Sequence, residues 1–259
     1  SAMNLVYALE MLGTAAFAVS GALAASRKRM DIFGFCVLAL MPAVGGGTVR
    51  DVIIDRVPVF WISDNRYIAV AIIAALVVFF APHPKPGGRR QLLVWADALG
   101  LALFAALGTQ ISLAHDTGPL VAVMLGVVTA VTGGMIRDII CNEIPLILSR
   151  EIYATAAFAA SLAYVLVDRL GGGSSNALGI AVVTGLAVRG LALLPRGGFR
   201  PRRRRLPRGH SPRGPRGPGT DRSPRGPGPR PLRGRRRGGR AAGRPGALPR
   251  GGTGRSASR

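Results

Sequence analysis

Gly45-Gly46-Gly47-Thr48-Val49-Arg50-Asp51 is the stretch that decides the fold, and Gly133-Gly134-Met135-Ile136-Arg137-Asp138 repeats most of it 87 residues later. Both stretches lie in apolar runs that approach the roughly 20 residues a helix needs to cross a bilayer. Consecutive glycines lower helix propensity by about 1 kcal/mol each and permit non-helical dihedral angles. The pattern therefore predicts a bend or break inside two membrane spans, with a new half-helix beginning at each break.

The two stretches belong to a longer internal repeat. Residues 8–58 align with residues 95–145 at a constant offset of 87 without a gap, and 15 of the 51 positions are identical. Glu10 aligns with Asp97, and with one gap Tyr67 aligns with Tyr153. Each copy holds an odd number of predicted spans, so the second copy enters the membrane from the opposite side. The sequence predicts an inverted repeat with a pseudo-two-fold axis in the membrane plane, as in many transport proteins.

Seven apolar spans are predicted in the first 194 residues, which gives an all-α polytopic membrane protein. They cover about 5–25, 32–55, 67–81, 93–113, 119–141, 152–167 and 177–194, and the third and sixth are short for a bilayer. Repeat 1 takes in about 4–82 and repeat 2 about 91–168, with the helix at about 177–194 outside both. Residues 1–3 are set aside as a cloning scar and start.

Charge divides the chain into two unlike parts. The formal net charge is +22, but residues 1–194 hold 13 basic and 11 acidic residues, whereas residues 195–259 hold 21 Arg and one Asp. The second part also holds 16 Gly and 12 Pro, a composition that cannot bury a core and predicts disorder. One interpretation is a polybasic tail that contacts anionic lipid. The other is translation of GC-rich DNA in an unselected frame. With Phe199 as its one aromatic residue, the tail lacks stacking platforms, so no nucleic-acid partner is expected.

The basic residues of the loops predict the orientation. One set of alternate loops contains Arg27, Lys28, Arg29, Lys85, Arg89, Arg90 and Arg150, and the opposite set contains Arg56, Arg66 and Arg169. Positively charged loops remain in the cytoplasm, so the N-terminus is expected outside and the C-terminus inside.

Enzyme and metal chemistry find little support in the sequence. Cys36 and Cys141 lie in apolar runs, and the three histidines lack metal-ligand spacing. No P-loop, nucleophile elbow or dinucleotide fingerprint occurs in the chain. We therefore expect no catalytic residues, no metal site and no cofactor.

The charges inside the spans carry the functional prediction. A charged group at a span centre costs about 2.5–3.5 kcal/mol, so the two Arg-Asp pairs must face the interior, pair, or line water. Gly46 shares a helix face with Arg50, and Gly47 shares one with Asp51. The inverted symmetry is expected to bring both constellations together near mid-depth. The predicted pathway residues are Gly45, Gly46, Gly47, Thr48, Arg50, Asp51, Gly133, Gly134, Arg137, Asp138, Glu10 and Asp97.

Phe17 and Phe104 are the gate candidates of this pathway. Each shares a helix face with a carboxylate nearer the mouth, Glu10 in the first span and Asp97 in the fourth. An alternative interpretation remains open for all these positions. The glycines would then serve close helix packing, and the Arg-Asp pairs would be structural clasps between the repeats.

At these motifs the chain resembles the prokaryotic branch of the trimeric intracellular cation (TRIC) channel family. The resemblance covers about 4–194 and includes a proline after each motif, Pro58 and Pro145. It implies a homotrimer in the bacterial inner membrane, with a pore in each protomer that conducts monovalent cations, chiefly potassium. It also implies that the second and fifth spans kink at their glycines and flank the pore. Animal relatives carry a lysine near the second-span break, whereas the lysines here, Lys28 and Lys85, lie in loops.

Two other functions stay open at this point. Close bacterial relatives are also grouped as glycine transporters, and inverted repeats with broken helices suit transporters as well as channels. In a transporter, Arg50 or Arg137 would hold a substrate carboxylate, and Asp51 or Asp138 would hold its ammonium group. A third hypothesis is a membrane scaffold without transport, whose tail recruits nucleic acid or anionic lipid.

Overall fold

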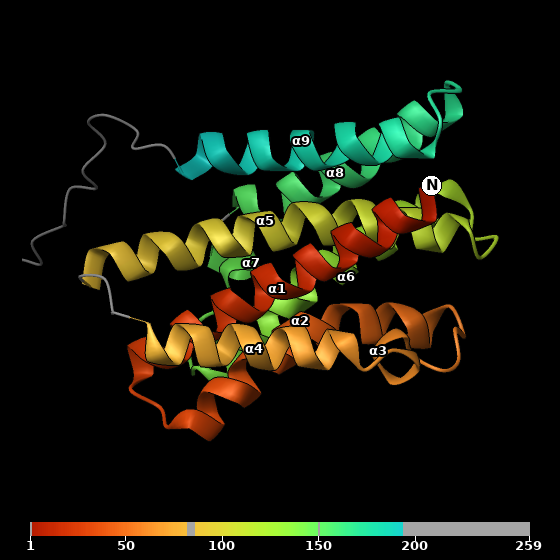
Figure 1. Ribbon diagram of the computed structural model, residues 1–259. Helices are drawn as coiled ribbons and strands as arrows, with labels where there is room; N and C mark the ends of the chain where they lie inside the picture. Colours follow the sequence, from red (N-terminus) through yellow and green to blue (C-terminus); the bar gives the residue numbers. More distant parts are fainter. Residues whose placement is uncertain (1, 82–85, 150, 194–259) are drawn as a thin grey trace, which may run out of the picture. The chain divides into compact units, whose positions relative to one another are not determined.

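The computed structural model describes residues 2–81, 86–149 and 151–193, and within these ranges the regular secondary structure is helical (Figure 1). The long helices follow the predicted spans, and two short ones, α3 (Phe60–Ser63) and α7 (Leu146–Ser149), lie in connections. The long ones are α1 (Ala2–Lys28), α2 (Ile32–Ile53), α4 (Arg66–Phe80), α5 (Pro86–Leu113), α6 (Pro119–Ile140), α8 (Glu151–Arg169) and α9 (Ser174–Leu193). The all-α fold class is confirmed. The predicted tail at 195–259 lies outside the described residues.

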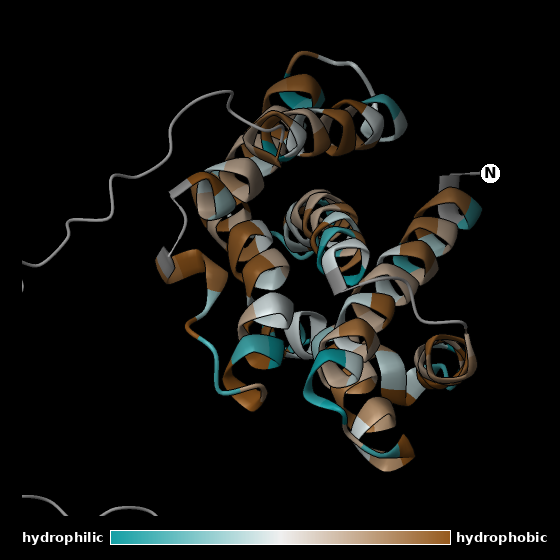
Figure 2. Ribbon diagram, turned by 90° about the vertical axis from the view of Figure 1, so that its left-hand side faces the viewer, coloured by the Kyte–Doolittle hydropathy of each residue, from teal (hydrophilic) through white to brown (hydrophobic). Residues whose placement is uncertain are grey.

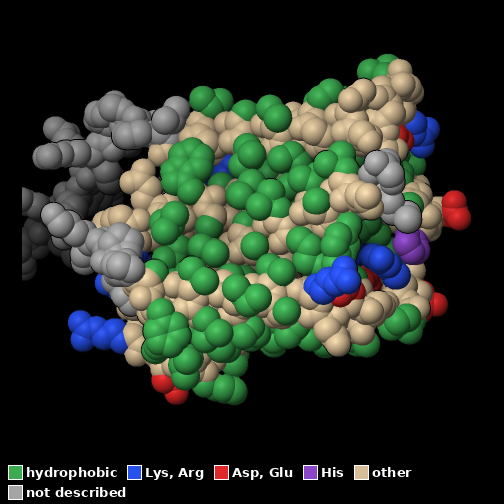
Figure 3. Space-filling view, viewed as in Figure 1, with side chains coloured by type: hydrophobic (Ala, Val, Ile, Leu, Met, Phe, Trp, Pro, Cys, Tyr) green, Lys and Arg blue, Asp and Glu red, His purple; other side chains and the backbone are tan. Residues whose placement is uncertain are grey.

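Helix lengths and surface chemistry suit a bilayer. In the described part of the chain, six helices are long and apolar enough to cross a membrane, and α4, with 15 residues, is a shorter apolar helix. Apolar side chains cover the middle of the face seen in Figure 3, while most of its charged side chains gather at the two ends. Predicted and observed bounds agree within three residues except at α5, which begins seven residues earlier than expected.

The predicted inverted repeat organises the packing. α1, α2 and α4 pack on one another, and α5, α6 and α8 do the same. The two halves meet where α1 packs against α5 and α2 packs against α6. Figure 1 shows α1 alongside α5, and Figure 2, turned by 90°, shows hydrophobic (brown) segments on the helices. α9 packs on α5 and α8, so it belongs to neither repeat and extends the second half.

Small residues bring the helices of each repeat together at equivalent places. A Cβ on Gly21 of α1 would meet the backbone carbonyl of Leu38 and the ring of Pro42. At the aligned position in α5, a Cβ on Gly108 would meet the Thr129 side chain at 2.9 Å. Pro42 and Thr129 are themselves related by the offset of 87, so the repeat seen in the sequence is a repeat of contacts.

The expected helix breaks are the main correction to the predicted fold. α2 is α-helical without interruption across Gly45, Gly46 and Gly47, and α6 is likewise continuous across its two glycines. No half-helix begins at either place in these two helices. Glycine is needed at these positions because the backbones of α2 and α6 approach closely. A Cβ on Gly46 would meet the carbonyl oxygen of Thr129, and a Cβ on Gly133 would lie 2.6 Å from the carbonyl oxygen of Pro42. The bend of the two helices stays a prediction.

Candidate functional site

The crossing of α2 and α6 determines where the buried charges lie. Gly46 faces Thr129 and Gly133 faces Pro42, so the two helices run antiparallel through the crossing. This register places Arg50 beside residue 125 and separates it from Arg137 by about 18 Å along the helix. The expectation of one shared constellation at mid-depth is therefore wrong. The structure forms two networks, on opposite sides of the crossing.

The first network centres on Asp51 in the last turns of α2. Nε and Nη2 of Arg50 donate to Asp51 Oδ1 at 2.8 and 2.6 Å, and both side chains are almost fully buried. The backbone N–H of Phe60, at the start of α3, donates to Asp51 Oδ2 at 3.0 Å. Arg56 contributes a second guanidinium, with Nη1 3.6 Å from Asp51 Oδ1. Asp51 thus ties the end of α2 to α3.

Aromatic rings connect this pair to Glu10 of α1. The hydroxyl of Tyr67 donates to Glu10 Oε2 at 2.6 Å. Tyr67 packs edge-to-face on Phe60 with ring centroids 4.7 Å apart, and the Arg50 guanidinium lies 5.9 Å from the Phe60 centroid. Glu10 is partly exposed. A partly exposed carboxylate thus lies beside a buried aromatic and guanidinium layer.

The second network repeats the local pairing at the end of α6. Nε and Nη2 of Arg137 donate to Asp138 Oδ1 at 2.9 and 2.8 Å. The backbone N–H of Leu146, at the start of α7, donates to Asp138 Oδ2 at 2.9 Å. Asp51 and Asp138 therefore play the same structural role. Each accepts a hydrogen bond from the first backbone N–H of the short helix that follows its own span, α3 or α7.

Arg137 has further partners from the other repeat and from its own. Its Nη1 donates to Asp97 Oδ1 at 2.7 Å and to the Ser20 hydroxyl of α1 at 2.6 Å. Tyr153 of α8 also donates to Asp97 Oδ1, at 3.2 Å. Asp97 is fully buried, so it does not lie at an open mouth, whereas Glu10 is partly exposed. The two aligned carboxylates therefore differ in exposure and in partners.

The gate candidates lie between the two repeats. Phe17 and Phe104 stack with centroids 5.4 Å apart and ring planes at 9°, and both are buried. A Cβ on Gly100 would lie 2.9 Å from the Phe17 ring, and one on Gly13 would lie 3.1 Å from the Phe104 ring. The stacked pair fills the interface between α1 and α5.

The remaining predicted residues line the helix contacts around the networks. Thr48 donates to the Val44 carbonyl at 2.7 Å and accepts from the Trp61 indole at 2.9 Å. Gly45 faces Ile136, and Gly47 faces Phe60.

Gly134 faces the Tyr153 hydroxyl and Asp97, and so adjoins the second network directly. The packing interpretation of the glycines is therefore supported by every one of these contacts.

Sequence reasoning missed several participants. Ser20, Phe60 and Trp61 lack any motif, so only their contacts reveal them. Arg189 can be recognised from the sequence, because an arginine inside the seventh apolar span is costly and therefore indicates a specific role. Its side chain is buried, and its guanidinium carbon lies 4.8 Å from the centroid of the Tyr153 ring.

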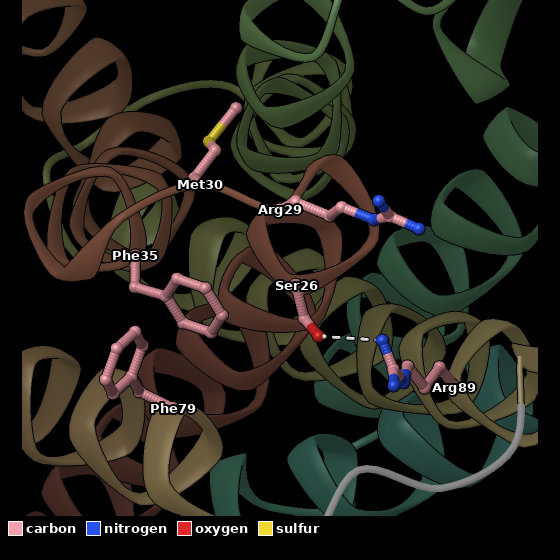
Figure 4. A pocket seen from close by; sticks show the side chains of 6 residues that line it. All are labelled: Ser26, Arg29, Met30, Phe35, Phe79 and Arg89. Carbon is pink, nitrogen blue, oxygen red and sulfur yellow. Dashed lines mark hydrogen bonds between the residues drawn. The ribbon is translucent and has the colours of Figure 1, made fainter. Parts of the chain in front are cut away.

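A separate cavity of about 450 Å³ lies where α1 ends and α5 begins (Figure 4). Arg89 donates to the Ser26 hydroxyl there at 3.2 Å, and Phe35 packs edge-to-face on Phe79 with centroids 5.0 Å apart. Arg29 and Met30 complete its lining. None of the predicted pathway residues lines this cavity, so it is distinct from the two networks.

An inverted repeat of apolar helices with buried charge networks is the architecture of many membrane transport proteins. Comparison with protein families matches residues 7–83 and 94–169 to the family described as "Glycine transporter". The chain belongs to this family. The matched ranges correspond to the two repeats recognised in the sequence.

Individual relatives agree with this assignment. A UPF0126 membrane protein of Vibrio cholerae is 41% identical over 191 residues, which are 72% of this chain and 78% of the relative. The UPF0126 inner membrane protein YadS of Escherichia coli is 45% identical over 152 residues, which are 59% of this chain and 73% of the relative.

Solved structures of TRIC channels share the fold. The TRIC trimeric intracellular cation channel orthologue from Rhodobacter sphaeroides is 41% identical, with a TM-score of 0.69 over 73% of this chain and 96% of that one. A prokaryotic TRIC channel crystallised in 0.5 M KCl is 27% identical, with a TM-score of 0.70 over 73% of this chain and 96% of its own. The resemblance to the TRIC family inferred from the glycine motifs is confirmed.

Proposed function

We propose that the protein is a potassium-permeable cation channel, a homotrimer with one pore in each protomer between the inverted repeats. The observation that carries this proposal is the shared fold with the Rhodobacter sphaeroides cation channel, whose chain is matched over 96% of its length. The permeant ions are K⁺ and Na⁺, and no cofactor takes part. The partners are two further copies of the chain and the surrounding lipids.

The chemistry of the interface suits a cation path. Glu10 offers a partly exposed carboxylate to an entering cation, in front of the buried layer of Tyr67 and Arg50. Beyond this layer lie the Phe17–Phe104 stack and then the buried network around Asp97. In this arrangement, the stack and the buried networks are closed constrictions. Ion flow requires them to separate, and water then satisfies the charges they expose.

Glycine transport is the second candidate, and the family description favours it. Binding a zwitterion requires a guanidinium for its carboxylate and a carboxylate for its ammonium group. Arg50 and Arg137 each already donate two hydrogen bonds to the neighbouring aspartate, and a backbone N–H occupies the other oxygen of each aspartate. A substrate would have to displace these bonds, whereas a cation path only needs to pass beside them. We therefore rank the channel first.

A paired assay distinguishes the two functions. The purified protein is reconstituted in planar bilayers for current recording and in liposomes for uptake of labelled glycine. A channel gives unitary K⁺ currents and no glycine accumulation. Glycine accumulation without unitary currents would establish the transporter instead, and the absence of both would leave the scaffold hypothesis.

We also propose that the protein lies in the bacterial inner membrane with its N-terminus outside and C-terminus in the cytoplasm. The excess of basic residues near Arg27 and Arg89 supports this orientation. Alkaline phosphatase inserted in the loop at Asp116 is then active, and green fluorescent protein fused after Leu193 is fluorescent. The reverse pattern would contradict the orientation. Contact of the tail with anionic lipid is a proposal about residues outside the described ranges.

A further inference from the structure

Arg189 is a buried charge on the helix that belongs to neither repeat. Its side chain is 3% exposed, although it stands in an apolar helix. α9 is held close to the second repeat by small residues: a Cβ on Gly185 would lie 3.0 Å from Ala102 and 3.1 Å from Ala160. This close seating fixes the depth at which Arg189 enters the bundle. A buried charge in such a helix is costly and marks a function or a required partner.

The guanidinium of Arg189 reaches the second network through an aromatic ring. It lies 4.8 Å from the centroid of Tyr153, within the distance at which a cation is attracted to the face of a ring. The hydroxyl of Tyr153 donates to Asp97, which also accepts from Arg137. Gly134 leaves room for that hydroxyl beside α6. Arg189 thereby links α9 to the buried carboxylate of α5.

Comparison of the two repeats shows what α9 adds. In the first network, Asp51 is contacted by a second guanidinium, that of Arg56. The position aligned with Arg56 is Glu143, an acidic residue, which pairs instead with Arg27 and Lys28 at 3.4 and 3.2 Å. The second repeat thus lacks an equivalent of Arg56 at that position. The positive charge that α9 brings into the second network comes from outside the repeat.

We propose that Arg189 is a positioning residue that holds Tyr153 against Asp97 and keeps the second network closed to permeant cations. The inference rests on the proposed channel function. Two effects act together in the closed state. The ring of Tyr153 is clamped between the guanidinium and the carboxylate, and the positive charge of Arg189 repels a cation that approaches Asp97. Opening then requires Arg189 to move away from the ring.

Charge-selective substitutions in the full-length protein test this role. Arg189→Met removes the guanidinium and keeps an unbranched neutral chain about as long as the aliphatic part of arginine, which is tolerated in an apolar helix. Arg189→Lys keeps the positive charge. Arg169→Gln removes an exposed arginine from the end of α8 and serves as the matched control. The readout is macroscopic K⁺ current per trimer in planar bilayers, with size-exclusion chromatography to verify assembly.

Arg189→Met is expected to raise the K⁺ current by about fivefold, the low end of the coupling typical between a regulatory group and a distant step. Arg189→Lys and Arg169→Gln stay near the wild-type current. Tyr153→Leu raises the current as Arg189→Met does, and the double variant adds nothing further, since both changes release the same contact. If Arg189→Met fails to assemble, the single variants Tyr153→Leu and Arg189→Lys still test the inference: the K⁺ current should rise in the first and stay near wild type in the second.

Several outcomes overturn the inference. Arg189→Met and Arg189→Lys with equal effects would indicate a packing role only, and an unchanged or reduced current in Arg189→Met would exclude a closing role. An increase in Arg169→Gln as large as in Arg189→Met would show that the effect is not local. A wild-type protein that conducts no K⁺ would instead contradict the proposed channel function, and the inference about Arg189 would fail with it.

Discussion

Arg137 shows at the scale of one residue how the membrane domain accommodates charge. Its guanidinium is almost fully buried and donates to Asp138, Asp97 and Ser20, which lie on three different helices. A charge in hydrocarbon is tolerated when its donors are all directed at acceptors, and here each acceptor also fixes a helix. In the proposed channel the same residue is both a clasp and a constriction, so the two interpretations of the Arg-Asp motifs are compatible.

Removing this guanidinium exposes its contribution to stability. Arg137→Gln leaves two carboxylates buried without their partner and is expected to destabilise the fold by about 3–5 kcal/mol. Thermal unfolding in detergent, followed by tryptophan fluorescence, measures the change. Adding Asp97→Asn removes one of the orphaned charges, so the double variant should be more stable than Arg137→Gln alone. A double variant less stable than the single one would show that the carboxylate is not the cause.

A second prediction at this scale concerns pH. The backbone N–H of Arg66 and the hydroxyl of Tyr7 donate to the Asp64 carboxylate at 2.9 and 2.8 Å, and they hold the pKa of Asp64 below its ordinary value. The ionised form is favoured by folding, so its stabilisation is present above the unfolded pKa of about 3.9 and lost as pH falls through the folded pKa. Asp64→Asn should lower the melting temperature slightly at pH 7. The difference between variant and wild type should vanish in acid, and a difference that persists there would contradict the assignment.

At the scale of elements, the crossing of α2 and α6 explains both the success and the error of sequence reasoning. The offset of 87 and the alternation of apolar runs were sufficient to predict the helices, the inverted repeat and the buried Arg-Asp pairs. The glycine runs predict helix breaks that the structure does not have, because propensity alone cannot separate a broken helix from one in close contact. Gly46 is required by the carbonyl of Thr129 on a helix 83 residues away in the chain, a contact that no local pattern contains.

Two substitutions separate close contact from helix propensity. Gly46→Ala places a Cβ against the Thr129 carbonyl and is expected to cost about 1–3 kcal/mol, because backbone must shift. Gly179→Ala in α9 meets no atom within 4 Å, so it should stabilise by up to about 1 kcal/mol through better helix propensity. Chemical denaturation of the two variants beside wild type measures both. If Gly46→Ala stabilised the protein, close contact with the Thr129 carbonyl would not be the reason for glycine at this position.

At the scale of the whole molecule, the described helices share a buried apolar core. Buried apolar side chains run continuously through both repeats, with a second cluster where α9 packs on α5 and α8. The residues that carry the charge of +22 lie largely outside this part, since 21 Arg fall in residues 195–259. The informative charges are instead those within the helices, where Arg50, Arg137 and Arg189 each contact a carboxylate or an aromatic ring.

Truncation after Leu194 tests whether the membrane domain suffices for function. Because the buried clusters and both charge networks are built from residues before 194, the truncated chain should melt at the same temperature as the full chain. It should also assemble to the same size and carry the same K⁺ current at moderate ionic strength. Binding to vesicles with anionic lipid should fall, because a polybasic segment adds about 1 kcal/mol per basic residue near such a surface. A truncated chain that loses assembly or current, with its melting temperature unchanged, would assign the tail a direct part in the channel.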